Sequence, residues 1–322
     1  MYTMTEGLAI LAKFDWHQLG EIISTPDNIP MILLMILIPF FTWYALKQAR
    51  ANDRLIAQLE ADPEMAKTHH RKRYPMEKKW EPTVLVWPHL LKVEFLAAIC
   101  VMVFLIVWSV AFNAPLEEPA NPNLTMNPSK APWYFLGLQE MLVYFDPWIA
   151  GVVMPTVIIV GLMAIPYCDV NPLGNGYYTW SQRKYAITTF FFGFHVLWIL
   201  MVLIGVFIRG PGWMWFWPGQ TWDHHRMIYE TNRNLNDILG LEGPVWAVLV
   251  GVVAIGVYTA VTGFVIHKLY MKYKGDLYAR MNLLQYGTMQ VLMIMMISLP
   301  VKIFLRLAMR VKYVMVTPWF NI

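Results

Sequence analysis

The sequence predicts an all-α membrane protein, a polytopic transmembrane bundle of about six spans. Of its 322 residues, 57% are hydrophobic and only 14% are charged, and the mean hydropathy is +0.44. Soluble domains carry about 25% charged residues, so a soluble domain and a disordered chain are both poor interpretations. The net charge of +4 lacks the interleaved basic pattern of a nucleic-acid-binding protein. Two cysteines and no CxxCH motif predict neither a disulfide scaffold nor a c-type haem.

Six stretches free of Asp, Glu, Lys and Arg approach the length of about 20 residues that a helix needs to cross a bilayer. Prolines interrupt several of them, which helical bundles tolerate because neighbouring groups satisfy the freed carbonyls. No basic region and cleavage site precede the first stretch, so we expect no signal peptide. The stretches are Ile29–Leu46, Phe95–Phe112, Pro147–Cys168, Tyr185–Ile208, Pro244–Ile266 and, least securely, Leu283–Val301.

The distribution of Lys and Arg predicts the orientation, because these residues concentrate in cytoplasmic loops. If the segment 47–92 is cytoplasmic, sixteen of the 25 basic residues lie inside and five lie outside. Four more follow the last span and would lie outside, which is a mild violation of the rule. We therefore expect a multi-pass protein of the bacterial inner membrane with an external N-terminus.

The spans divide the chain into segments of different character. Residues 1–28 predict an external amphipathic segment, with Leu8–Ile23 lying on the membrane surface. A charged segment, helix-prone as far as Asp62-Pro63, is expected to form a cytoplasmic linker. The complete division is 1–28, the extra N-terminal span 29–46, the linker 47–92, a three-span domain 93–208 with a loop at 113–146, a Trp-rich external loop 209–243, and two further spans with a tail at 244–322.

The external loop 113–146 carries the most informative pattern. It contains Pro119–Pro122 and Asn127-Pro128, then Trp133–Phe135, Glu140 and Asp146-Pro147. Proline fixes the backbone angle φ, so a stiff loop of this kind suits a preformed pocket at the membrane edge. Aromatic residues at this depth are also typical of simple interfacial anchors, and that alternative stays open.

These residues, in their order, resemble the C-terminal half of cytochrome b, which is the separate subunit IV in cytochrome b6f complexes. The resemblance rests on Pro119–Pro122, on Trp133–Phe135 and on the Pro-Tyr-x-Asp-x-Asn-Pro motif at 166–172. It covers roughly residues 87–208, the helices called E, F and G in that family. The N-terminal span and the last two spans lie outside it.

The resemblance implies a subunit of a quinol–cytochrome c oxidoreductase, inactive alone, that forms the outer quinol-oxidising pocket. Its expected partners are a haem-bearing cytochrome b chain, a Rieske iron–sulfur protein, a c-type cytochrome and the lipid membrane. One electron would pass to the iron–sulfur centre and one to a b haem, with protons released outside. The cofactor is a quinol or quinone, menaquinone being one candidate, and the b haems belong to the partner chain.

One position departs from the family. Its usual tetrapeptide is Pro-Glu-Trp-Tyr, and Pro132 stands here where the family has its proton-accepting glutamate. Glu140 follows Trp133 by seven residues, two helical turns, and is our candidate substitute, with Tyr134 as a quinol hydrogen-bonding residue. Alternatively, Glu140 pairs with Lys130 or faces water. Lys130, Pro132, Trp133 and Phe135 are expected to line the pocket.

A second candidate site lies at the inner start of the second span. His89, Lys92 and Glu94 follow Pro88 at a spacing that resembles the family's quinone-reducing side. There Glu94 would supply protons and Lys92 would stabilise the reduced anion. A collar of charged side chains reaching the membrane surface is the alternative.

The histidines predict that this chain alone ligates no haem. A b haem needs two axial histidines at membrane depth, and only His195 lies mid-span. A hydrogen bond to a neighbouring helix is the simplest role for it. We expect no metal site, although Asp223-His224-His225 in the Trp-rich loop could hold one; that loop more plausibly docks the membrane or a partner.

Three interpretations remain open from the sequence. The chain is a catalytic subunit of a quinol-oxidising complex, a structural membrane anchor that lost its quinol site, or a quinone-binding subunit of a different respiratory complex. A transporter would show matched broken segments in two halves, and no such pairing is present.

Overall fold

The computed structural model describes residues 15–69, 85–113, 119–123, 125–174, 176–223 and 231–322. They divide into two units, one of residues 1–46 and 126–322 and one of residues 47–125, and each is considered by itself. Among the described residues there are helices and three isolated β-bridges but no β-strand. This confirms the all-α prediction.

All six predicted spans are helices long and apolar enough to cross a membrane. Several continue beyond the uncharged stretches, because the helix does not have to end where charged residues begin. The least secure span is a helix of 27 residues, α12, which starts with a capping box formed by Asn282 and Gln285. The six are Pro26–Ala61, Val86–Ala111, Ile149–Cys168, Trp180–Ile208, Pro244–Tyr278 and Leu283–Met309.

In the first unit, α2 (Trp16–Ser24) begins at Asp15, whose carboxylate accepts hydrogen bonds from the backbone N–H groups of His17 and Gln18. Of the predicted surface segment Leu8–Ile23, residues 8–14 lie outside the described part. The helix α3 (Ile29–Ala61) contains Pro39 and continues past Leu46 into the second unit. It ends directly before Asp62-Pro63, as the sequence indicated.

The third and fourth spans of the chain, which are the second and third spans of the domain 93–208, are interrupted by π-helical turns. The third span of the chain consists of η5 (Ile149–Val153) and α7 (Met154–Cys168). The fourth consists of α8 (Trp180–Phe191), η6 (Phe192–Ile199), α9 (Leu200–Leu203) and η7 (Ile204–Ile208). Short α6 (Leu136–Tyr144) precedes them and packs on α9, so the loop 113–146 contains a helix that the sequence did not predict separately.

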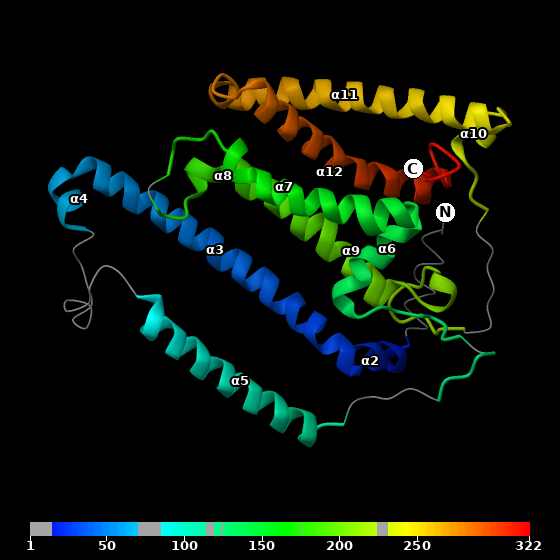
Figure 1. Cartoon of the computed structure of the whole chain (residues 1–322), viewed down its shortest axis with the longest axis horizontal. Helices are drawn as coiled ribbons and strands as arrows, with labels where there is room; N and C mark the ends of the chain where they lie inside the picture. Colours follow the sequence, from blue (N-terminus) through cyan, green and yellow to red (C-terminus); the bar gives the residue numbers. More distant parts are fainter. Residues whose placement is uncertain (1–14, 70–84, 114–118, 124, 175, 224–230) are drawn as a thin grey trace. The chain divides into compact units, whose positions relative to one another are not determined.

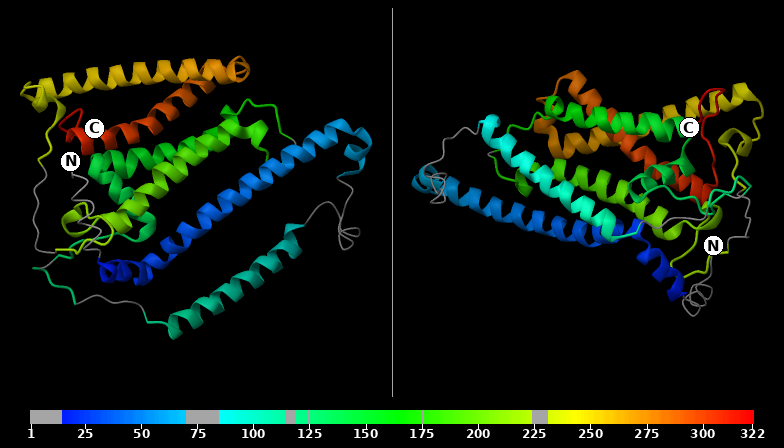
Figure 2. Two further views of the ribbon diagram at one scale, coloured as in Figure 1. Left: turned by 180° about the vertical axis from the view of Figure 1, so that it is seen from behind. Right: turned by 60° about the horizontal axis from the view of Figure 1, so that its bottom comes forward.

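The last two spans form a helical pair. Helix α11 (Pro244–Tyr278) packs along α12 (Leu283–Met309), and α12 also packs on α7 and α6. Figure 1 and the left view of Figure 2 show α12 between α11 and α7. Short α10 (Leu235–Ile238) leads into α11.

The C-terminal tail folds back on the loop side of this unit. Its backbone pairs with that of Arg233, and the side chain of Asn321 donates to Asp146 Oδ2 at 3.1 Å. The Nζ of Lys302, which is 4% exposed, donates to the carbonyl of Lys312 at 3.0 Å. The tail therefore contacts Arg233 and Asp146, which belong to two different loops.

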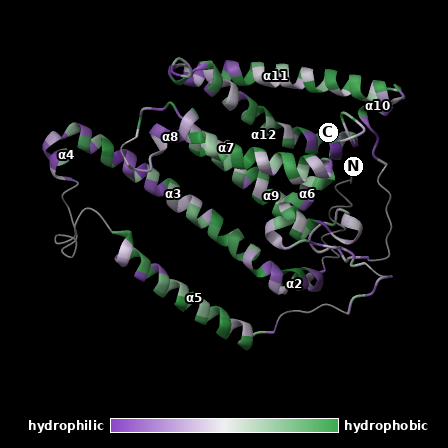
Figure 3. Cartoon of the chain, in the orientation of Figure 1, coloured by the Kyte–Doolittle hydropathy of each residue, from purple (hydrophilic) through white to green (hydrophobic). Residues whose placement is uncertain are grey.

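In the second unit, α4 (Pro63–His69), η3 (Val86–Leu90) and α5 (Leu91–Ala111) are described. Helix α5 has no buried residue in the isolated chain and is apolar along most of its length (Figure 3). Such exposed apolar surface belongs in lipid or against another subunit. The basic segment after His69 lies outside the described residues.

Candidate functional site

The loop 126–146 is held to the C-terminal end of the fourth span by a buried ion pair. Arg209 donates from Nε to Glu140 Oε2 at 2.9 Å and from Nη2 to Oε1 at 2.7 Å. Glu140 is 0% exposed and Arg209 is 2% exposed. The paired geometry is the strong, two-point form of the Arg–carboxylate interaction, so it fixes both the distance and the orientation of α6 relative to the end of η7.

Two further donors complete the surroundings of Glu140. The hydroxyl of Tyr144 donates to Oε1 at 2.7 Å, and the indole N–H of Trp213, in η8 (Pro211–Trp213), donates to Oε2 at 3.1 Å. Arg209 in turn donates to the carbonyl of Trp213 at 3.0 Å and lies 5.4 Å from the centre of the Trp215 ring. The four residues Glu140, Arg209, Tyr144 and Trp213 are called the Glu140 network below.

Burial and charge within the network shift two pKa values. Burial and the neighbouring Glu140 charge raise the pKa of the Tyr144 hydroxyl, which therefore stays a donor. Burial acts to lower the pKa of Arg209, but the hydrogen bonds and charge of Glu140 outweigh it and raise that pKa. The network thus holds one cation against one anion at the edge of the membrane.

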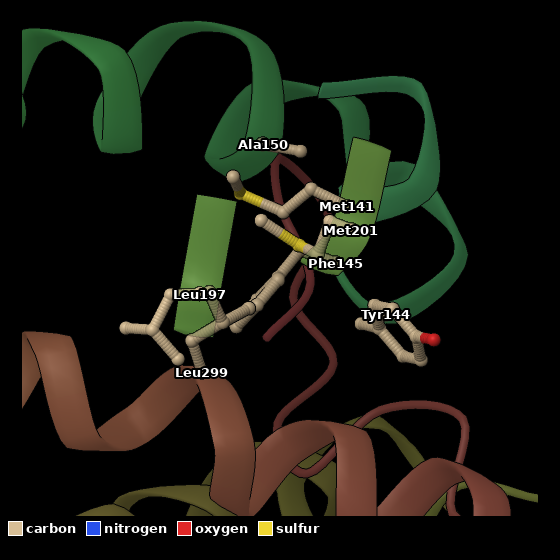
Figure 4. Packing of buried hydrophobic residues seen from close by; sticks show 7 residues of the cluster. All are labelled: Met141, Tyr144, Phe145, Ala150, Leu197, Met201 and Leu299. Atoms are coloured by element: carbon tan, nitrogen blue, oxygen red, sulfur yellow. The ribbon is translucent and has the colours of Figure 1, made fainter. Parts of the chain in front are cut away.

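Tyr144 connects the network to the apolar core of the unit. Its ring packs with Met141, Phe145, Ala150, Leu197, Met201 and Leu299, while its hydroxyl points away from those side chains (Figure 4). The core therefore positions the Tyr144 hydroxyl, which donates one of the four hydrogen bonds that Glu140 accepts. A polar cluster supported in this way resists local rearrangement, because each of its members is fixed by a second contact.

Lys130 does not pair with Glu140. Its Nζ donates to the carbonyl of Val206 at 2.8 Å and lies 4.9 Å from the centre of the Trp222 ring. Burial lowers its pKa to about 8. Both alternatives considered for Glu140, pairing with Lys130 and exposure to water, are wrong, because its carboxylate is buried and forms an ion pair with Arg209.

The turn that carries the aromatic triplet is fixed by Gln139. Its Oε1 accepts from the backbone N–H of Ala131 at 2.8 Å, and its Nε2 donates to the carbonyl of Ser129 at 2.8 Å. The triplet itself is the 3-10 turn η4 (Trp133–Phe135) at the start of α6, and Pro132 precedes it as an exposed cap. Trp133 packs inward beside Leu136 and Val202.

Tyr134 and Phe135 have the opposite orientation. They are 51% and 52% exposed, and their ring centres lie 4.7 Å apart. A depression of about 420 Å³ lies between the loop 126–146 and η8, and neither of the two rings lines it. Its walls are Asn127, Pro128, Ser129, Gln139, Leu142, Val143, Gly212 and Trp213. The loop therefore presents an exposed aromatic pair on a turn that Gln139 holds.

The inner candidate residues lie in the second unit. His89 is in η3, and Lys92 and Glu94 are in the first turn of α5, where all three side chains are exposed. His224 and His225 lie outside the described residues. In the described part of the chain, no group of three or more His, Cys, Asp or Glu residues could hold a metal ion.

Sequence reasoning missed Arg209 and Trp213 as partners of Glu140. A signal was present: a charged residue at the end of an apolar span, such as Arg209, tends to pair with an opposite charge. Glu140 and Arg209 are 69 residues apart, however, and several basic residues could have been chosen.

Fold and site together define a polytopic membrane protein. Its proline-rich loop is held to the end of the fourth span by the Arg209–Glu140 pair. Residues 119–209 match the family described as cytochrome b(C-terminal)/b6/petD. The segment includes Glu140, Tyr144 and Arg209 of the Glu140 network, but not Trp213, and two of the three family-like spans. The match begins after α5, so the assignment of α5 to helix E stays a prediction.

A curated relative agrees with this assignment. The chain is 33% identical over 95 residues to the "menaquinol:cytochrome c reductase cytochrome c subunit" of Geobacillus thermodenitrificans. The alignment covers 28% of this chain and 38% of the relative, so the chain matches well under half of that protein. No solved structure matches the chain significantly.

Proposed function

We propose that this chain is a subunit of a quinol-oxidising membrane complex of the bc type and that its loop 126–146 forms one wall of the outer quinol pocket. The family of residues 119–209 and the menaquinol-linked relative support this proposal. The other wall, the b haems and the electron acceptors would come from a cytochrome b chain, a Rieske protein and a c-type cytochrome. Menaquinol is the quinol that the relative's name favours.

The exposed pair Tyr134 and Phe135 carries the proposal. Both rings are about half exposed although the turn beneath them is held by Gln139 and the Glu140 network. A quinol pocket needs an apolar wall and a hydrogen-bonding group at a fixed place. Phe135 supplies the first and the Tyr134 hydroxyl the second, with Lys130, Pro132 and Trp133 forming the base of the same wall.

Glu140 takes a positioning role in this proposal. Its oxygens accept four hydrogen bonds and no part of it is exposed, so accepting a quinol proton directly would require the ion pair to open. The prediction that Glu140 accepts the proton stays a prediction. The geometry favours the alternative that Glu140 fixes α6, and with it the direction in which Tyr134 points.

The inner site stays a separate proposal. His89, Lys92 and Glu94 follow one another at the beginning of α5 with their polar groups exposed, where a quinone bound to a partner subunit could receive protons from the inner side. Their alternative role as a charged collar at the membrane surface predicts no effect of E94Q on quinone reduction.

The outer pocket is tested by substituting Tyr134 in the assembled complex. We expect Y134A to lower quinol-dependent cytochrome c reduction about tenfold or more, because the quinol loses an orienting contact, and Y134F to lie between Y134A and the parent. The control is Y167A, which removes a tyrosine that is 79% exposed near the C-terminal end of α7, outside the loop 126–146. Unchanged activity of Y134A in a normally assembled complex would instead identify the chain as a structural anchor.

A further inference from the structure

A second cavity lies in the first unit, away from the outer loop. Its volume is about 600 Å³, and it runs between α3 and the α8–η6 part of the fourth span. Its walls are mostly aromatic and aliphatic. The side chains that the argument uses are Thr42 and Ala45 on α3, and Arg183, Ala186, Phe190 and His195 on the fourth span.

The cavity extends along the fourth span from Arg183 to His195. Twelve residues of helix measure about 18 Å at 1.5 Å per residue. One leaflet of a bilayer contributes about half of a hydrocarbon core of about 30 Å, which is about 15 Å. The cavity is therefore as long as one leaflet is thick, with one end at the span end and the other at the middle of the span.

The end at Arg183 is cationic and interfacial. Arg183 Nη1 pairs with Asp169 Oδ2 at 2.6 Å, and the neighbouring Lys184 is exposed, with its Nζ 5.8 Å from the centre of the Trp180 ring. Two cations against one carboxylate leave net positive charge at this mouth. Aromatic rings beside such charges are typical of the headgroup level of a membrane.

The end at His195 is apolar apart from the imidazole of His195 and the hydroxyl of Thr42. The Nε2 of His195 and the hydroxyl of Thr42 share a hydrogen bond of 2.9 Å, which ties α3 to η6. The rings of Phe190, Phe191 and Phe194 surround the imidazole at centre distances of 4.8 to 6.4 Å. The other ring nitrogen, Nδ1, is buried and has no hydrogen-bond partner among the described residues. Apart from this nitrogen and the Thr42–His195 pair, this end offers a bound molecule apolar contact.

We propose that this cavity binds one phospholipid of the adjoining leaflet, with its phosphate at Arg183 and Lys184 and one acyl chain along the Phe190 wall as far as the Thr42–His195 pair. Charge complementarity selects an anionic headgroup at the mouth, and the length of the cavity fits a chain that stops at mid-membrane. The lipid fills the space between α3, which lies outside the family segment, and the fourth span. It thereby stabilises the attachment of the extra helix.

The test is native mass spectrometry of the purified complex after mild delipidation, with the retained lipid identified by its mass. Substituting Ala186 or Ala45 by tryptophan fills the cavity from its two walls independently. We expect A186W and A45W each to retain about one phospholipid fewer per chain than the parent. The matched control is A98W, which places the same bulk on the exposed surface of α5.

Two results would overturn the proposal. One is a phospholipid count in both cavity variants equal to that of A98W. The other is the release of an isoprenoid quinone, rather than a phospholipid, when the cavity is filled. R183A gives an independent measurement that leaves the cavity open: we expect it to lower the retention of an anionic phospholipid more than that of a zwitterionic one added back in vesicles.

Discussion

Arg209 and Glu140 form a two-point ion pair that is almost completely buried, with N–O distances of 2.7 and 2.9 Å. The pair joins the C-terminal end of the fourth span to α6, the helix that follows the aromatic turn. Since Tyr144 and Trp213 donate to the same carboxylate, the direction of α6 depends on one charged group.

Removing either member of this pair should be strongly destabilising. We expect E140Q and R209Q each to lower the free energy of unfolding of the assembled subunit by about 3–5 kcal/mol, because each leaves an unmatched polar or charged group buried. The double variant should lose much less than the sum of the two. Denaturant unfolding of the detergent-solubilised complex measures all three values.

The exposed pair Glu64–Lys67 provides the control for this cycle. Its side chains are 80% and 69% exposed, so E64Q should cost no more than about 1 kcal/mol. Additive losses in the E140Q and R209Q cycle would mean that the two residues do not depend on each other.

Lys130 predicts a pH dependence of stability. Burial lowers its pKa to about 8 from the ordinary value of 10.5, so between these values the unfolded chain binds more protons than the folded one. Stability should therefore rise with pH from about 8 to about 10.5 through this group. The slope of the free energy of unfolding against pH should be smaller in K130M, and an identical slope in parent and variant would refute the assignment.

The C-terminal tail should be sensitive to one glycine of α11. A Cβ added at Gly251 would meet Met315 of the tail, whereas one at Gly256, a turn and a half further along the same helix, meets nothing within 4 Å. We expect G251A to release the tail, seen as faster proteolysis after residue 309, while G256A behaves as the parent. Equal rates in the two variants would show that the tail does not depend on this contact.

Much of the fold follows from the sequence because the membrane imposes a simple pattern. A helix must satisfy its own backbone in lipid, so uncharged stretches such as Ile29–Leu46 report spans directly. The ends of the helices were less predictable. Helices α3 and α11 continue for more than ten residues into charged sequence, because a helix keeps its own backbone hydrogen bonds outside the membrane as well.

The site was predictable in its location and less so in its contacts. The order of Pro119–Pro122, Trp133–Phe135 and the motif at 166–172 identified the segment that the family match covers. The partner of Glu140 was not predictable. A contact between residues 69 positions apart depends on how η7 and α6 pack, and the spacing of residues along one helix does not determine that packing. The spacing argument also assumed continuous α-helix from Trp133, where the chain makes a 3-10 turn before α6.

The central claim is that Tyr134 and Phe135 face a bound quinol head group. A density map of the purified complex with an inhibitor of quinol oxidation tests it most directly. We expect the inhibitor ring against these two side chains, with the Arg209–Glu140 pair closed behind them. Finding the two rings packed tightly against another subunit, with the inhibitor bound elsewhere, would contradict the account.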